Sequence, residues 1–151
     1  MAKKLQPKLR QVQSDMEKLI ERDLPRVVKR EGLQFISDNF AQQGFQTGSG
    51  VKKWKSRKPP KSKKEKRRQG RSILVDRGHL RRAWDQDSKA KPGKVIFENT
   101  RPYSEVHNEG GKAGRGSGFT MPERQMIGES GKLDDMIGKK VDKLMDKILN
   151  K

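Results

Sequence analysis

The stretch that shows both kinds of secondary structure most clearly is residues 94–111, Lys94-Val-Ile-Phe-Glu-Asn-Thr-Arg-Pro-Tyr-Ser-Glu-Val-His-Asn-Glu-Gly-Gly111. Its β-rich beginning, residues 94–99, predicts a strand. Tyr103, Val106 and His107 then recur at the i, i+3, i+4 spacing of one helix face, and the glycine pair at 110–111 predicts where that helix ends. Strands and helices therefore both contribute to the domain.

The same alternation continues on either side. Upstream, residues 73–75 form a short β-rich run, residues 80–84 predict a short helix with one apolar face, and residues 91–93 predict a turn. Downstream, residues 108–118 contain five glycines and predict a flexible loop. Residues 119–127 can form a second strand, which Pro122 would restrict to a sheet edge.

Both ends of the chain predict helices. Apolar residues recur every three or four positions near the N-terminus, at Leu5, Leu9, Val12, Met16 and Leu19. Pro25 leaves two alternatives open, a second helix that starts there or one long helix kinked there, and Gly44 is the expected stop. Residues 133–148 follow a 3.6-residue period, with Ser130 as the candidate N-cap.

A basic segment separates the first helical region from the remainder. Residues 51–71 hold twelve Lys/Arg and one Glu, a net charge of +11 out of +18 for the whole chain. Like charges at this density repel one another and resist packing, so we expect residues 55–71 to form a long mobile loop. We expect a contact surface for phosphate or for an acidic protein at these residues: Lys52, Lys53, Trp54, Lys55, Arg57, Lys58, Lys61, Lys63, Lys64, Lys66, Arg67, Arg68 and Arg71.

Length and composition limit the alternatives. A chain of 151 residues suits a single domain spanning 1–151, and its 29% hydrophobic content predicts a small core. The absence of cysteine excludes disulfides and thiolate metal sites, and the absence of a long apolar run excludes a membrane span. We expect the protein to be made and used in a cytosol.

No catalytic or cofactor motif is complete. The histidines, His79 and His107, have no HExxH or cysteine cluster beside them, so the spacing supports no metal site. A phosphate-binding P-loop fails because Gly111-Lys112 is followed by Ala113. We therefore expect no enzymatic activity. Trp84, Tyr103 and the apolar stripe of the last helix are most simply core, with an oligomer interface as the alternative.

Four short motifs follow one another along the chain. The first consists of Phe40-Ala-Gln-Gln-Gly44 and Trp54, and the second of Leu74, Gly78, Leu80 and Arg81. The third consists of Tyr103, Val106, His107 and Gly110, and the fourth of Pro122, Arg124, Met126, Ile127 and Gly128. Across these motifs the most characteristic positions are Gly78, Leu80, Arg81, Tyr103, His107, Gly110, Pro122, Arg124 and Gly128.

In order and spacing these motifs resemble the phage virion morphogenesis family, and within it the Mu-type tail completion, or head–tail joining, proteins. Some positions depart from the family pattern, with Arg77 before the glycine and Ala83-Trp84 in place of Ser-Ile. The resemblance implies a small α+β domain in which helices lie over a short antiparallel sheet. We expect residues 80–84 and 103–107 to brace that sheet and residues 122–128 to close it.

The resemblance also implies a structural role, without cofactor, at the head–tail joint or tail end of a tailed phage. The expected partners are further copies of the chain in a ring, often a hexamer, together with other neck, connector or tail proteins. The basic segment adds packaged DNA as a further expected contact, and no membrane is implied. The protein would reside in the virion, and in the host cytoplasm during assembly. The alternative function is that of a basic nucleic-acid-binding accessory protein.

Overall fold

The computed structural model describes residues 2–116 and 118–150, with side chains from residue 6 onward. One long helical rod opens the chain and consists of α1 (Ala2–Lys18), a π-helical turn η1 (Leu19–Asp23) and α2 (Leu24–Gln42). Of the apolar face predicted for α1, the side chain of Leu5 lies outside the described part. The second alternative for Pro25 is therefore the observed one, because the helix continues through the proline.

A backbone contact from the turn at residues 91–93 helps to accommodate Pro25 within the rod. Proline has no N–H to donate to the carbonyl four residues earlier, which here belongs to Glu21. That carbonyl instead accepts a bond from the backbone N–H of Gly93, at 3.4 Å. The rod ends at Gln43, whose φ of 49° is left-handed, so the expected stop at Gly44 lies one residue too late.

Three separate antiparallel hairpins follow, rather than the one sheet we expected. They are β1 (Gly44–Gln46) with β2 (Val51–Lys53), β3 (Lys89–Lys91) with β4 (Lys94–Ile96), and β5 (Gly111–Ala113) with β6 (Phe119–Met121). Each described strand has only three residues, and a lone hairpin of that size is marginal in water, so each depends on the helices beside it. The α+β class is confirmed.

Three short helices connect these hairpins: α3 (Lys63–Lys66), α4 (His79–Asp87) and α5 (Ser104–Glu109). The helices predicted around residues 80–84 and 103–107 and the turn at 91–93 are confirmed. The β-rich run at residues 73–75 does not form a strand, because Leu74 has a left-handed φ of 60° and the run forms a turn. Part of the glycine-rich loop, residues 111–113, is strand β5; residue 117 lies outside the described residues.

The core lies where α2 meets α4 and the segment after β6. Its buried members are Ile36, Phe40, Trp54, Leu80, Trp84 and Met126. The rings of Phe40 and Trp54 meet edge to face at 5.5 Å, which is a favourable aromatic geometry. Tyr103, by contrast, is 42% exposed, so the prediction that it is a core residue is wrong.

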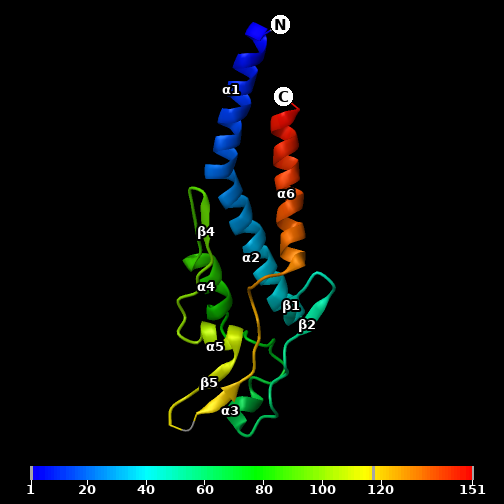
Figure 1. Ribbon diagram of the computed structural model, residues 1–151. Helices are drawn as coiled ribbons and strands as arrows, with labels where there is room; N and C mark the ends of the chain where they lie inside the picture. The colour runs from blue at the N-terminus through cyan, green and yellow to red at the C-terminus, as the bar shows by residue number, and fades with distance from the viewer. Residues whose placement is uncertain (1, 117, 151) are drawn as a thin grey trace.

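The last helix, α6 (Gly131–Leu149), runs back beside the rod so that both chain ends lie at the same end of the molecule (Figure 1). The C-terminal helix prediction is confirmed. Ser130 is its N-cap residue, but the hydroxyl donates to the carbonyl of Gln46 at 2.7 Å instead of capping the helix. Along its apolar stripe Ile148 is the buried residue, and most others are half-buried.

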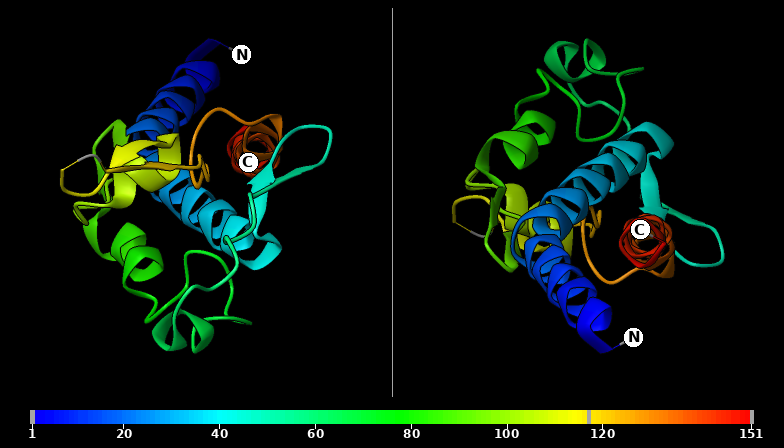
Figure 2. Two further views of the ribbon diagram at one scale, coloured as in Figure 1. Left: turned by 90° about the horizontal axis from the view of Figure 1, so that it is seen from below. Right: turned by 90° about the horizontal axis from the view of Figure 1, so that it is seen from above.

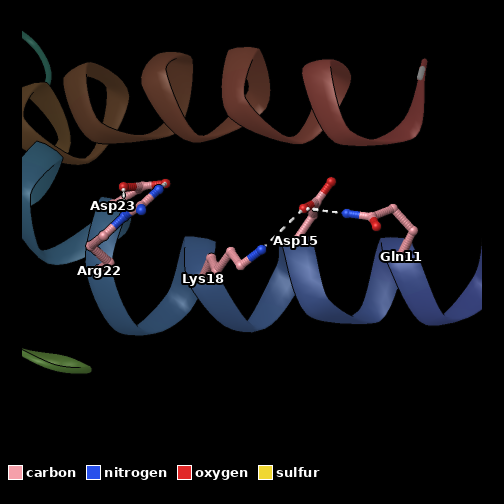
Figure 3. A network of polar contacts seen from close by, with 5 residues as sticks. All are labelled: Gln11, Asp15, Lys18, Arg22 and Asp23. Carbon is pink, nitrogen blue, oxygen red and sulfur yellow. Dashed lines mark hydrogen bonds and ion pairs between the residues drawn. The ribbon is translucent and has the colours of Figure 1, made fainter.

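The side of α1 facing α6 also carries polar groups. Figure 3 shows Asp15 pointing toward α6. Its carboxylate accepts a hydrogen bond from Gln11 Nε2 at 3.0 Å and lies 3.9 Å from Lys18 Nζ. Arg22 and Asp23 form a second pair in the π-helical turn, at 2.7 Å. These polar contacts join residues of the rod to one another.

The opposite end of the molecule carries α3 and the β5–β6 hairpin (Figure 1). Seen along the rod, α3 and α4 lie to one side of α2, and α6 and the β1–β2 hairpin lie to another (Figure 2). The two loops that we singled out from the sequence thus gather at the end farthest from both termini. The long helices provide the frame that holds them there.

Candidate functional site

The basic segment 51–71 is anchored at its start and carries free cations along its middle. Lys52 Nζ lies 3.4 Å from Glu123 Oε1, and Lys53 Nζ donates to the carbonyl of Gln42 at 2.8 Å. Trp54 is only 6% exposed, and its Nε1 donates to the carbonyl of Gln125 at 2.9 Å. Trp54 is therefore part of the core, and its assignment to a contact surface is wrong.

Arg57 closes the segment into a compact arch. Its guanidinium donates to the carbonyls of Arg68 at 2.7 Å and Ser72 at 2.8 Å, two points beyond the short helix α3. Arg71 adds an ion pair to Asp76 at 2.6 Å, and Arg68 lies 3.7 Å from the same carboxylate. Because these arginines bind the chain itself, they shape the segment and are less available to a partner.

The middle of the arch has its own local signal. Ser62 caps α3 by accepting a bond from the N–H of Glu65 at 3.2 Å, and Glu65 accepts one from the N–H of Lys61 at 2.5 Å. Ser62-Lys-Lys-Glu65 is the Ser-x-x-Glu pattern of a capping box, which our sequence analysis overlooked. Between Arg57 and Arg68, six exposed cations make no side-chain hydrogen bond or ion pair with the described residues: Lys58, Lys61, Lys63, Lys64, Lys66 and Arg67. The side chain of Lys55, just before the arch, is also exposed and makes none with them.

A cavity of about 1140 Å³ lies between this arch and the family-motif residues. One wall comes from the arch, including Arg57, Lys58 and Lys61, and the other includes Gly78, Leu80, Tyr103 and His107. These two regions are far apart in the sequence, where the first is predicted to be a contact surface and the second to brace the sheet. The structure brings them to one cationic hollow.

The fourth motif, residues 122–128, runs through the core. The prediction that it closes a sheet with the strand β4 is wrong. Side chains from distant elements hold its backbone. Asn39 Nδ2 donates to the carbonyl of Met126 at 3.0 Å, and Asn108 Oδ1 accepts from the N–H of Met126 at 2.8 Å. Because Met126 is fully buried, these side chains satisfy backbone groups that water cannot reach.

Arg124 ties that motif to the basic segment. The side chain is 7% exposed, and its Nε and Nη2 atoms donate to the carbonyl of Lys55 at 3.1 and 3.0 Å. Its backbone N–H donates to the carbonyl of His107 at 2.8 Å. Burial, followed by the charge of Arg57, lowers the pKa of Arg124, which still remains cationic at neutral pH. One motif residue thus fixes where the basic segment begins.

His107 lies beside Arg124 on the wall of the cavity. Its ring meets that of Tyr103 edge to face at 6.0 Å. Burial lowers the pKa of His107, and the charge of Arg124 lowers it further, so the imidazole is neutral at pH 7. Within the described residues no group of His, Asp and Glu side chains is placed to hold a metal ion.

The remaining motif residues have conformational or surface positions. Gly78 and Gly110 adopt left-handed φ values of 76° and 77°, at the start of α4 and the end of α5. Arg81 is exposed on α4, while Leu80 beside it is buried. Pro122 and Gly128 bound the buried fourth motif and are half-buried.

All of these motif positions lie within the part of the chain that matches one known family. The sequence model of the phage virion morphogenesis family matches residues 3–146. The chain belongs to this family. Its role is therefore in building a phage particle, as a structural or assembly component. No curated protein and no solved structure matches the chain.

The motif residues of this family member have structural positions in the fold. In this member the motif residues position the buried fourth motif and the start of the basic segment, through contacts such as Arg124 with Lys55. Among the described residues, no helix is at once long and apolar enough to cross a membrane. Within the arch, the free cations are the side chains that bind no other described residue.

Proposed function

We propose that this chain acts at the head–tail interface of a tailed phage, as a Mu-type tail completion or neck component, and that several copies form a ring, such as a hexamer. The observation that carries the proposal is the match of residues 3–146 to the virion morphogenesis family. The role is non-catalytic and needs no cofactor.

Exposed apolar side chains on the helices support self-association. Leu9 is 59% exposed, Ile20 49% and Leu149 61%. Leu9 belongs to α1 and Leu149 to α6, the two helices whose outer ends carry the chain termini (Figure 1), and Ile20 belongs to the π-helical turn midway along the rod. Packing against a neighbouring copy would remove this apolar surface from water. A head-to-tail contact repeated around an axis closes into a ring.

The free cations of the arch support a contact at the other end. Lys58, Lys61, Lys63, Lys64, Lys66 and Arg67 share one exposed region without a carboxylate partner among the described residues. Such a cluster is attracted to an acidic face of a neighbouring neck or tail protein, or to the packaged DNA. In a ring, each copy would present this cluster to the same partner.

A charge-neutralised variant tests the contact without disturbing the arch. The substitutions Lys63→Gln, Lys64→Gln, Lys66→Gln and Arg67→Gln leave Arg57, Arg71 and Arg124 in place. The matched control removes four exposed lysines from α6 instead: Lys132→Gln, Lys139→Gln, Lys143→Gln and Lys147→Gln. In a phage that lacks the natural gene, we expect the arch variant to leave heads and tails unjoined in electron micrographs. Normal infectious titre from the arch variant would contradict the proposed contact.

Light scattering tests the ring separately. We expect the purified chain, alone or with its neck partner, to form one discrete oligomer, and Leu9→Ser with Leu149→Ser to reduce its mass. Monomers under all of these conditions would rule out the ring while leaving the contact proposal open.

The alternative, a nucleic-acid-binding accessory protein, is favoured by the +11 charge of residues 51–71. The burial of Trp54 removes the aromatic side chain that could have stacked on bases in that segment. A salt titration of duplex binding separates the two functions, because binding by phosphate contacts alone weakens steeply as salt rises. Tight binding near physiological salt would favour the accessory protein.

A further inference from the structure

A second cationic hollow lies between α2, α4 and strand β3, apart from the basic segment. It has a volume of about 630 Å³. Five cationic side chains line it, three from α2 and two from α4: Arg26, Lys29, Arg30, Arg81 and Arg82. Its apolar lining comes mainly from Leu33, Ile36 and Trp84. We call this site the α2–α4 groove.

The charges of the groove are only partly neutralised. Arg30 pairs with Glu31 at 3.1 Å, and Asp85 is the one carboxylate among the lining residues. Arg82 Nη2 donates to the carbonyl of Arg77 at 2.9 Å. Lys29 and Arg81 make no side-chain hydrogen bond or ion pair with the described part of the chain. Like charges held this close repel one another, so an anion in the groove would stabilise it.

Trp84 provides an independent observation. The residue is 94% buried, being 6% exposed, and it lines the groove. Its indole Nε1 is buried and finds no hydrogen-bond acceptor among residues 2–116 and 118–150. A buried tryptophan N–H usually has a partner, and leaving it unpaired costs about 1–3 kcal/mol. The other indole, of Trp54, does have one, the carbonyl of Gln125.

The lining identifies the chemistry of the occupant. Cations beside an apolar surface suit a ligand that combines carboxylates with an apolar side chain. A nucleic-acid backbone would use the cations but not Leu33, Ile36 and Trp84. A second copy of the chain carries a net charge of +18, so it matches a cationic groove less well than an acidic partner does. The occupant that fits is therefore an acidic segment of a different protein.

We propose that the α2–α4 groove binds an acidic peptide segment of another protein, which places an apolar side chain beside Trp84, offers a backbone carbonyl to the Trp84 indole N–H, and sets its carboxylates near Lys29 and Arg81. This site is separate from the arch and holds whether or not the chain works at the head–tail interface. It would give the protein two partner surfaces, one at its basic end and one on the flank of the rod.

The probe is a short fluorescent peptide with one leucine flanked by glutamates, added to the full chain. Binding is followed by fluorescence anisotropy and by the two indole N–H signals in a proton–nitrogen NMR spectrum, which Trp54→Phe assigns. We expect the Trp84 signal to shift and the Trp54 signal to stay. Lys29→Gln with Arg81→Gln should weaken binding about ten-fold, the equivalent of about 1.4 kcal/mol for the two charge contacts.

Three comparisons can overturn the proposal. Lys139→Gln with Lys143→Gln removes the same charge from α6, and an equal loss of affinity there would reduce the effect to general electrostatics. A peptide with serine in place of leucine should bind several-fold more weakly, and equal binding would remove the apolar contact. A single-stranded oligonucleotide of the same charge that shifts the Trp84 signal equally would make the groove a nucleic-acid site instead.

Discussion

Replacing Asn39 with alanine should lower the free energy of unfolding by about 2–4 kcal/mol. Asn39 is fully buried on α2, and its amide joins three parts of the chain. Its Nδ2 donates to the carbonyl of Met126 at 3.0 Å, and its Oδ1 accepts from the N–H of Gln46 at 2.9 Å. Alanine can replace neither contact.

The magnitude follows from the groups left behind. A buried polar group that loses its partner costs about 1–3 kcal/mol, and Asn39→Ala leaves one carbonyl and one N–H unpaired. Alanine returns about 0.5 kcal/mol through its higher helix propensity. For a chain of this length the net change corresponds to a fall of about 5–15 °C in Tm.

The assay is urea unfolding followed by circular dichroism, supported by a thermal scan. Gln34→Ala is the matched control, because Gln34 lies exposed on the same helix and its side chain donates to the half-buried Asp38 at 2.8 Å. The control should change stability by less than about 0.5 kcal/mol. If Asn39→Ala were as stable as Gln34→Ala, Asn39 would not hold the fourth motif in place.

Three further predictions follow from single sites. Gly110→Ala should lower the free energy of unfolding by at least about 1–3 kcal/mol, because Gly110 has a φ of 77° and a Cβ there would lie 2.9 Å from the backbone nitrogen of Glu123. The control Gly138→Ala, in open space on α6, should raise it by up to about 1 kcal/mol. If urea titrations gave the two variants equal stability, Gly110 would not be a strained position. Trp54→Phe should cost about 1–3 kcal/mol by leaving the carbonyl of Gln125 unpaired, and unchanged stability would show that this bond is dispensable. Because burial depresses the pKa of His107, its stabilising contribution is present above about pH 6.5 and is lost as the pH falls toward the folded-state value. Unfolding at several pH values should therefore show a weaker acid dependence for His107→Gln, with the exposed His79→Gln as control; an unchanged slope for His107→Gln would count against this.

The helices could be predicted because their signal is local. The 3.6-residue apolar period of α6 and the i, i+3, i+4 triads of α4 and α5 each lie within a few turns of chain. The strand pairs were harder to predict from the sequence. A three-residue strand has little pattern of its own, and nothing in residues 73–75 indicated the left-handed backbone of Leu74. The extended path of residues 122–128 was mistaken for a sheet edge, although its backbone bonds to side chains.

For the candidate site, the sequence identified the place but not the construction. The charge density of residues 51–71 was enough to predict a contact surface there, because clustered cations repel one another and attract anions whatever the fold. Which cations are free depended on contacts between distant residues. The guanidinium groups of Arg57 and Arg124 donate hydrogen bonds to backbone carbonyls, whereas the side chains of Lys63 and Arg67 bind no described residue. The capping box at Ser62 could have predicted the short helix α3, but the dense charge around it favoured the prediction of a loop.

The amino-acid sequence by itself determined the family, the α+β class, the terminal helices and the basic segment, because short motifs, helical periodicity and charge are properties of neighbouring residues. Only the tertiary structure decided that Trp54 belongs to the core and that Arg124 anchors the basic segment. It alone placed the cations of α2 and α4 around Trp84. Burial and hydrogen-bond partnership depend on which distant segments meet, and no local pattern records that.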